Sequence, residues 1–290
     1  MRLNGRRESN NVEDRRRSGI SSAGVGGMGI GGVIVMALIT WALGGNPLDA
    51  LQMVGDQQTT EMTAQGQQRE FTPEEQELAK FSRQILAGTE DIWTEVFRSM
   101  GREYVPPRMV LYTGSTTTGC GHGQAAMGPF YCSADQCLYI DLTFFTSMKK
   151  ELGADGDFAY AYVIAHEVGH HVEYLLGSLE QAHRQMERMS KADANRVSVR
   201  LELLADFYAG VWAYHDNKAF ASLEDGDIEE AINCAQVIGD NYLQEKARGY
   251  SQPESFTHGT SKQRMKWLKL GLTTGDMGKG RTFELSDSEL

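Results

Sequence analysis

Apolar residues change their spacing several times along this chain, and each change indicates a segment of different structure. Residues 18–48 carry no charge, and the inner part, residues 28–43, is mostly apolar. With its glycine-rich flanks, this part reaches the roughly 20 residues that an α-helix needs to cross a bilayer. A buried core helix would normally carry a polar face, which this segment lacks. The pattern therefore predicts a single transmembrane helix over residues 18–45, with a cleaved signal peptide as the alternative.

A helical pattern follows residues 46–70, a glutamine- and threonine-rich stretch typical of a linker. Thr72 suits an N-cap, Pro73 suits the first helical position, and Glu75 completes a capping box. Apolar residues then recur at helical spacing, with a break expected near Gly88. Gly101 is a typical residue for the end of such a helix.

Short strands come next, and helices dominate the remainder. Residues 109–112 predict one strand, residues 130–132 and 138–142 predict two more, and the Gly/Thr-rich residues 113–126 predict a loop between them. Helical patterns cover residues 157–176, 178–190, 193–215, 227–247 and 260–271. A small N-terminal sheet followed by helices predicts an α+β domain over residues 71–275, with a C-terminal tail at 276–290.

The charge is unevenly distributed. Residues 1–17 contain six arginines against three acidic residues, a net charge of +3, whereas the whole chain carries −11. We expect this basic end to be a disordered cytoplasmic tail, which would place the chain from about residue 46 outside the cytoplasm. The acidic remainder argues against a nucleic-acid partner, which usually requires a basic face.

The chain has four cysteines: Cys120, Cys132, Cys137 and Cys234. They suit an oxidising compartment, where one or two disulfides would form. Four cysteines allow three pairings, and the spacing does not choose among them. No C-x-x-C pair occurs among the first three, so a cysteine-based zinc site is disfavoured.

One short motif indicates chemistry. Residues His166-Glu167-Val168-Gly169-His170 form the pattern H-E-x-x-H within a predicted helix. Positions i and i+4 share a helix face, so the two histidines can bind one metal ion. Glu167 lies beside them and could accept a proton from a water activated by that metal. Because catalytic zinc usually takes three protein ligands, we expect one Zn²⁺ and a third ligand elsewhere.

The third ligand is expected on the helix predicted over residues 193–215. A histidine six residues after His170 is excluded, because that position holds Leu176. Glu202 and Asp206 are four residues apart on an otherwise apolar stretch, where acidic side chains need a partner. Glu202 would bind the metal and Asp206 would orient a ligating histidine. Alternatively, both acids face solvent or pair with nearby arginines.

Together these motifs resemble a known family. The chain resembles the bacterial neutral zinc metallopeptidases, weakly over residues 1–18 and well over about 70–275. The similarity rests on residues 119–121, 128–132, 138–141, 165–171, 200–213 and 256–264. The resemblance implies a zincin-like domain with a Glu-zincin site, in which His166, His170 and Glu202 hold zinc and Glu167 is the general base.

Further expectations concern the surroundings of the metal. His258 precedes a predicted helix, with Arg264 nearly two turns further on, and a His or Arg near the oxyanion would stabilise a charged intermediate. A structural hydrogen bond at the helix start is the alternative for His258. Residues 128–132 could pair with an extended peptide substrate. A disulfide between Cys120 and Cys132 would brace that strand.

The leading hypothesis is a membrane-anchored zinc peptidase that cleaves peptides or proteins, with its catalytic domain outside the cytoplasm. One alternative is a zinc-binding but non-proteolytic scaffold for envelope proteins. Another is a structural zinc site closed by a fourth ligand such as His258.

Overall fold

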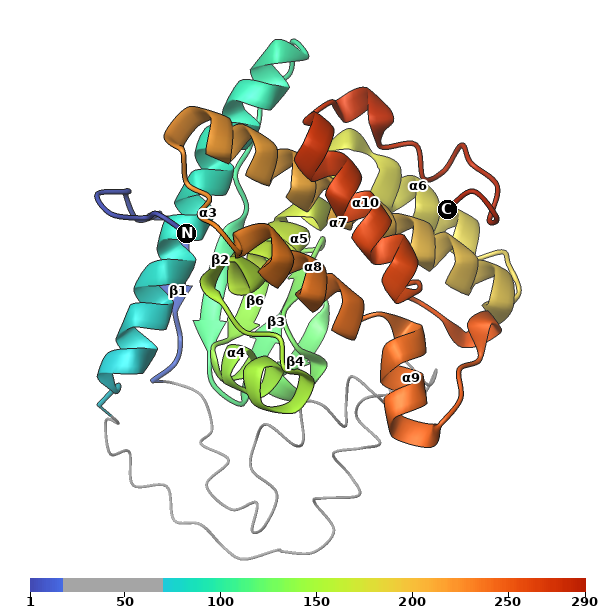
Figure 1. Ribbon diagram of the computed structural model, residues 1–290, viewed down its shortest axis with the longest axis horizontal. Helices are drawn as coiled ribbons and strands as arrows, with labels where there is room; N and C mark the ends of the chain where they lie inside the picture. The colour runs from blue at the N-terminus through green and yellow to red at the C-terminus, as the bar shows by residue number, and fades with distance from the viewer. Residues whose placement is uncertain (18–69) are drawn as a thin grey trace, which may run out of the picture.

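The computed structural model describes residues 1–17 and 70–290, drawn as ribbons in Figure 1. The predicted transmembrane helix, residues 18–45, lies outside the described residues, as does the linker that follows it. Within the described ranges, no helix is long and apolar enough to cross a membrane. The predicted α+β class is confirmed, since a small sheet is combined with a mostly helical remainder.

The main sheet has four strands in the order β1-β2-β6-β5. Strands β1 (Val12–Asp14), β2 (Arg108–Tyr112) and β6 (Cys137–Asp141) are parallel, and β5 (Phe130–Cys132) runs antiparallel to β6 at one edge. β6 is buried throughout and β2 nearly so, which explains their apolar sequences. The strands predicted at 109–112, 130–132 and 138–142 are confirmed to within one residue at each end.

The expectation of a disordered tail over residues 1–17 is wrong. β1 forms the second edge of the main sheet, and the arginines bind acidic groups of the domain. Arg6 pairs with the buried Asp216 at 2.8 Å, and Arg7 pairs with Asp91 at 2.6 Å. The composition of a short segment cannot reveal partners that lie 84 or 210 residues away.

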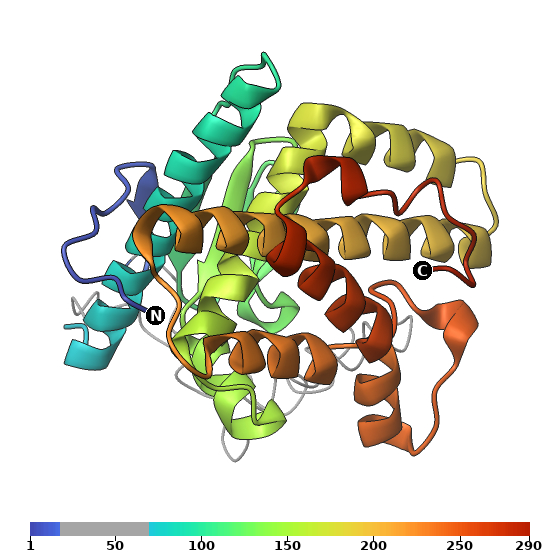
Figure 2. The same ribbon diagram turned by 45° about the horizontal axis from the view of Figure 1, so that its top comes forward.

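The helix α3 (Pro73–Ser99) begins with the predicted capping box and continues without the break expected at Gly88. A Cβ at Gly88 would lie 3.0 Å from Nη2 of Arg6 and 3.3 Å from Oδ1 of Asp216. The glycine therefore makes room for this ion pair. Figures 1 and 2 show α3 running along one side of the molecule, beside the N-terminal segment.

The predicted loop at 113–126 contains a two-stranded hairpin, β3 (Ser115–Thr118) and β4 (Gly121–Gln124). The predicted disulfide is confirmed: Cys120, between these strands, is bonded to Cys132 at the end of β5. Cys137 and Cys234 are free and buried. The bridge therefore ties the hairpin to the edge strand.

The helical part contains a short helix α4 (Thr143–Ser147), a π-helical turn at Met148–Leu152 and six longer helices. The longer ones are α5 (Asp157–Leu176), α6 (Ser178–Met186), α7 (Lys191–Phe220), α8 (Asp227–Val237), α9 (Asp240–Arg248) and α10 (Ser261–Thr274). The single helix predicted over 227–247 is divided at Gly239, where a Cβ would lie 2.4 Å from the backbone nitrogen of Ser261. Figure 2 shows α10 crossing α7.

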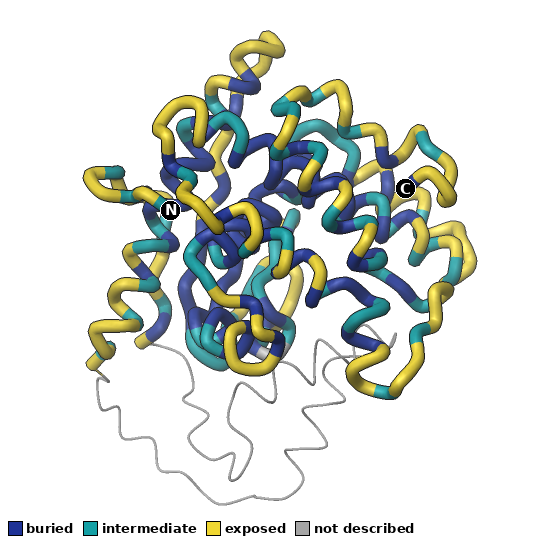
Figure 3. The backbone as a smooth tube through the Cα atoms, in the orientation of Figure 1, coloured by how far each residue is buried: buried dark blue, intermediate teal, exposed yellow. Residues whose placement is uncertain are grey.

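The predicted C-terminal tail packs against α7. Thr282 is buried, and Arg200 of α7 donates hydrogen bonds to the carbonyl oxygens of Thr282 and Leu285. Figure 3 shows the buried residues concentrated in the centre of the molecule. Most residues of α5 and half of those of α7 are buried, and these two helices carry the predicted metal ligands.

Candidate metal centre

The crossing of α5 and α7 brings three predicted ligands together. Ligand atoms of His166, His170 and Glu202 all lie within 4.8 Å of one another. The Glu202 carboxylate is 3.2 Å from Nε2 of His166 and 3.6 Å from Nε2 of His170. Gly169 permits this approach, because a Cβ there would lie 2.8 Å from the carbonyl oxygen of Ala205. Two imidazoles and one carboxylate form a donor set that zinc prefers.

The outer nitrogens of both histidines are held by carboxylates. Nδ1 of His166 is 2.8 Å from Oδ1 of Asp206, and Nδ1 of His170 is 2.9 Å from Oε2 of Glu173. A neutral imidazole that donates its Nδ1–H to a carboxylate keeps the Nε2 lone pair for a metal. The geometry therefore fits a bound cation.

Asp206 lies at the centre of a buried ionic network. It accepts hydrogen bonds from Tyr162 at 2.5 Å and from Nε and Nη2 of Arg264 at 2.8 and 2.9 Å. Burial raises the pKa of Asp206, but Arg264 and His166 outweigh burial and lower this pKa to about 2. Arg264, which the sequence suggested as an oxyanion group, is thus the counter-ion of Asp206.

Glu173, which contacts the proposed ligand His170, was not identified from the sequence. It is completely buried, and no hydrogen-bond partner of its Oε1 is found among the described residues. Burial raises the pKa of Glu173 to about 7, against the opposing effect of His170. The i,i+3 spacing from His170 could have identified it, since such residues are neighbours on a helix.

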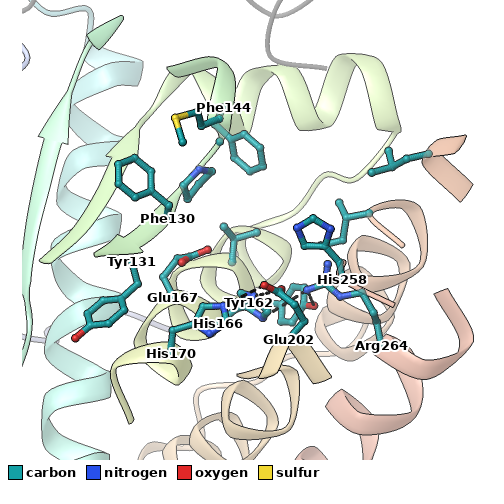
Figure 4. Close-up of a pocket in the computed structure, with 16 residues that line it drawn as sticks. Phe130, Tyr131, Phe144, Tyr162, His166, Glu167, His170, Glu202, His258 and Arg264 are labelled. Atoms are coloured by element: carbon teal, nitrogen blue, oxygen red, sulfur yellow. Dashed lines mark hydrogen bonds and ion pairs between the residues drawn. The ribbon is translucent and has the colours of Figure 1, made fainter. Parts of the chain in front are cut away.

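His258 lies at the same cavity as the metal ligands, which α10 and the segment before it help to enclose (Figure 4). Its Nδ1 is 3.0 Å from Oδ1 of Asp240, the first residue of α9. The other Asp240 oxygen accepts hydrogen bonds from the backbone N–H groups of residues 257, 258 and 259. Burial lowers the pKa of His258, but the negative charges of Asp240 and Glu202 raise it overall. No local sequence pattern links Asp240 to this loop.

Glu167 lines a cavity of about 210 Å³ next to the histidines. Burial raises the pKa of Glu167, against the opposing effect of the two histidines. In Figure 4 its carboxylate lies between these histidines and the rings of Phe130 and Phe144. A carboxylate in this place can exchange protons with a reacting group in the cavity.

His171 belongs to a separate set of contacts. Its Nε2–H donates to the carbonyl oxygen of Val105 at 2.7 Å, and its Nδ1 accepts from the hydroxyl of Tyr131 at 2.9 Å. Burial lowers the pKa of His171 to about 4. This neutral imidazole therefore fixes Tyr131 on the edge strand.

Comparison with known proteins agrees with this geometry. The model of a family described as "putative neutral zinc metallopeptidase" matches residues 1–283. The chain belongs to this family. The uncharacterized protein YpfJ of Escherichia coli K12 is 49% identical over 287 residues, which cover 98% of this chain and 99% of that relative. The uncharacterized protein Rv2575 of Mycobacterium tuberculosis H37Rv is 39% identical over 194 residues, or 63% and 64% of the two chains.

Family membership agrees with the chemistry of the donor set, because both indicate zinc as the metal. The family match includes residues 1–17, of which Val12–Asp14 form strand β1 of the main sheet. No solved structure matches this chain, so the zincin-like fold remains a prediction.

Proposed function

We propose that this protein is a zinc-dependent peptidase that hydrolyses peptide bonds with Glu167 as the general base. The observation that carries the proposal is the convergence of His166, His170 and Glu202 beside the Glu167 carboxylate in one cavity. In the described part of the chain, this ligand group contains no fourth protein residue. Three protein ligands with an open cavity are typical of catalytic zinc, whereas structural zinc is closed by four.

Zinc bound at this site would polarise the scissile carbonyl and lower the pKa of the attacking water. Glu167 accepts the proton of that water and passes it to the leaving amine. The raised pKa of the buried Glu167 makes it a better base than an exposed glutamate.

His258 would stabilise the negative charge that develops on the carbonyl oxygen. Asp240 fixes Nδ1 of this imidazole, and its negative charge helps raise the pKa of His258. A positioned donor in a buried site stabilises a transition state strongly, because it does not need to reorganise. The position of His258 at the cavity supports this role over a purely structural one.

The edge strand β5 would hold the substrate backbone by strand addition. β5 pairs with β6 on one side only, and residues 128–131 line the cavity. Tyr131 is tethered to His171 and Cys132 to Cys120, so the middle and the C-terminal end of β5 are fixed. A rigid edge reduces the entropy lost when a peptide binds.

We also propose that the site works outside the cytoplasm, because disulfides such as Cys120–Cys132 persist in oxidising compartments. While β1 stays paired with β2, residues 1–17 and the catalytic helices lie on the same side of any membrane. Labelling of cells with an impermeant thiol reagent should therefore modify Asn4→Cys and Glu103→Cys variants equally.

Substitution of the base tests the peptidase proposal. Glu167→Gln should abolish cleavage of a peptide mixture and leave one zinc ion bound, whereas Glu180→Gln, at an exposed position on α6, should change neither. Cleavage by the Glu167→Gln protein at the wild-type rate would refute the mechanism. A wild-type protein that binds zinc and cleaves no peptide would favour the scaffold alternative.

A further inference from the structure

Beyond the metal ligands, the wall of the catalytic cavity is mainly apolar. Phe130 from β5, Phe144 from α4 and Val163 from α5 line it from the side of the sheet. Ile238, the C-cap residue of α8, and Leu243 of α9 line it from the C-terminal part of the chain. Elements distant in sequence thus supply one apolar surface, which we call the apolar subsite.

This subsite adjoins the reacting groups. Val163 precedes His166 by three residues and Glu167 by four, so all three share one face of α5. In Figure 4 the rings of Phe130 and Phe144 lie beyond the Glu167 carboxylate. A substrate side chain in the subsite would therefore belong to a residue next to the scissile bond.

Apart from Glu167, the proposed base, the charged side chains that line the cavity already have partners. Arg264 is paired with Asp206, and Glu202 lies against the two motif histidines. His258 is held by Asp240. A charged substrate side chain would lose its hydration without gaining a dedicated counter-ion, which is unfavourable.

We infer that the apolar subsite selects substrates with one bulky apolar residue, such as leucine, isoleucine or phenylalanine, directly beside the cleaved bond. The inference rests on the proposed peptidase function. The whole cavity, including the part beside the metal ligands, measures about 210 Å³, so the apolar subsite within it has room for one side chain and not for several. An apolar wall that only excluded water would show no such preference.

Binding of zinc-directed inhibitors tests the subsite without requiring cleavage. The probes are short hydroxamic acids that differ only in one side chain: hydrogen, isobutyl, benzyl, carboxyethyl or aminobutyl. With the zinc-loaded Glu167→Gln protein, calorimetry should show the isobutyl and benzyl compounds binding about tenfold or more tighter than the unsubstituted one. The carboxyethyl and aminobutyl compounds should bind no more tightly than the unsubstituted one. Equal affinities across the series would overturn the inference.

A change of charge in the subsite provides a second test. Ile238→Glu should make the aminobutyl compound bind better than the benzyl compound, because it supplies a counter-ion. Ile228→Glu, at an exposed position on α8 outside the cavity, should leave the original order of affinities unchanged. If Ile238→Glu does not fold, as judged by zinc content and thermal melting, Ile238→Phe should weaken the benzyl compound more than the unsubstituted one. If the order of inhibitor affinities is unchanged in the folded Ile238 variants, the subsite is refuted.

Sequencing of the products from a peptide library separates the two proposals. Wild-type protein should cut beside leucine, isoleucine or phenylalanine at one fixed position. Cleavage without such a preference would reject the subsite and keep the peptidase. Absence of cleavage together with the predicted inhibitor order would reject the peptidase and keep the subsite.

Discussion

The ion pair between Asp206 and Arg264 gives the sharpest test of how the fold supports the metal. Asp206→Asn removes the charge and keeps the shape of the side chain. Arg264, which is 3% exposed, would then lack its buried counter-ion. Removal of one partner of a buried pair costs about 3–5 kcal/mol. We expect the free energy of unfolding to fall by about 3 kcal/mol, since the amide oxygen of asparagine can still accept one hydrogen bond.

The same substitution should weaken zinc binding through His166. The Nδ1–H of His166 would lose the carboxylate that lies 2.8 Å away. Loss of such an outer carboxylate typically lowers metal affinity by about 10–100-fold. Stability and zinc affinity therefore fall together in the single variant, for two separable reasons.

A double variant separates these reasons. In Asp206→Asn/Arg264→Met no unpaired charge remains, so most of the lost stability should return while zinc affinity stays low. Urea denaturation in the presence of a chelator measures stability without the contribution of metal binding. Competition with a chromophoric chelator measures zinc affinity. A double variant no more stable than Asp206→Asn would refute the reasoning, as would wild-type zinc affinity in either protein.

Three further predictions concern the frame of the site. Cys120→Ser opens the bridge to β5 and should lower the free energy of unfolding by about 3 kcal/mol in urea, with zinc content unchanged; equal stability would contradict this. Asp216→Ala leaves Arg6 without its buried partner and should speed hydrogen exchange in β1, and unchanged protection of β1 would count against its docking. Gly169→Ala places a Cβ 2.8 Å from the Ala205 carbonyl oxygen. Because this substitution forces α5 and α7 apart, it should lower the free energy of unfolding by about 1–3 kcal/mol and reduce the affinity for zinc. Titration curves identical to those of the wild-type protein would contradict this prediction.

Local patterns predicted the elements that short-range forces determine. The capping box at Thr72, the strands on either side of residues 133–136 and the helix that carries the motif appear as expected. Each depends on residues within a few positions of one another. The i,i+4 spacing likewise predicted that Glu202 and Asp206 share a face, which the structure turns towards His166.

The errors arose where partners lie far apart along the chain. The arginines of residues 1–17 have the composition of a basic tail, but Arg6 meets Asp216 and β1 meets β2 only in the folded protein. Gly88 suggested a helix break, whereas it accommodates that ion pair. Asp240 and His258 are 18 residues apart and belong to different elements, so no periodicity connects them.

By itself, the sequence determined the chemical inventory: a helix with two imidazoles on one face, a neighbouring carboxylate, and a second helix with two acids four residues apart. The tertiary structure decided how these groups are used. It placed Glu202 against both histidines, assigned Arg264 to Asp206, and built an apolar wall from five separate elements. The physical reason is the range of the interactions. Helical spacing is set by neighbouring residues, whereas burial, ion pairing and pKa depend on whichever distant segments the fold packs against the site.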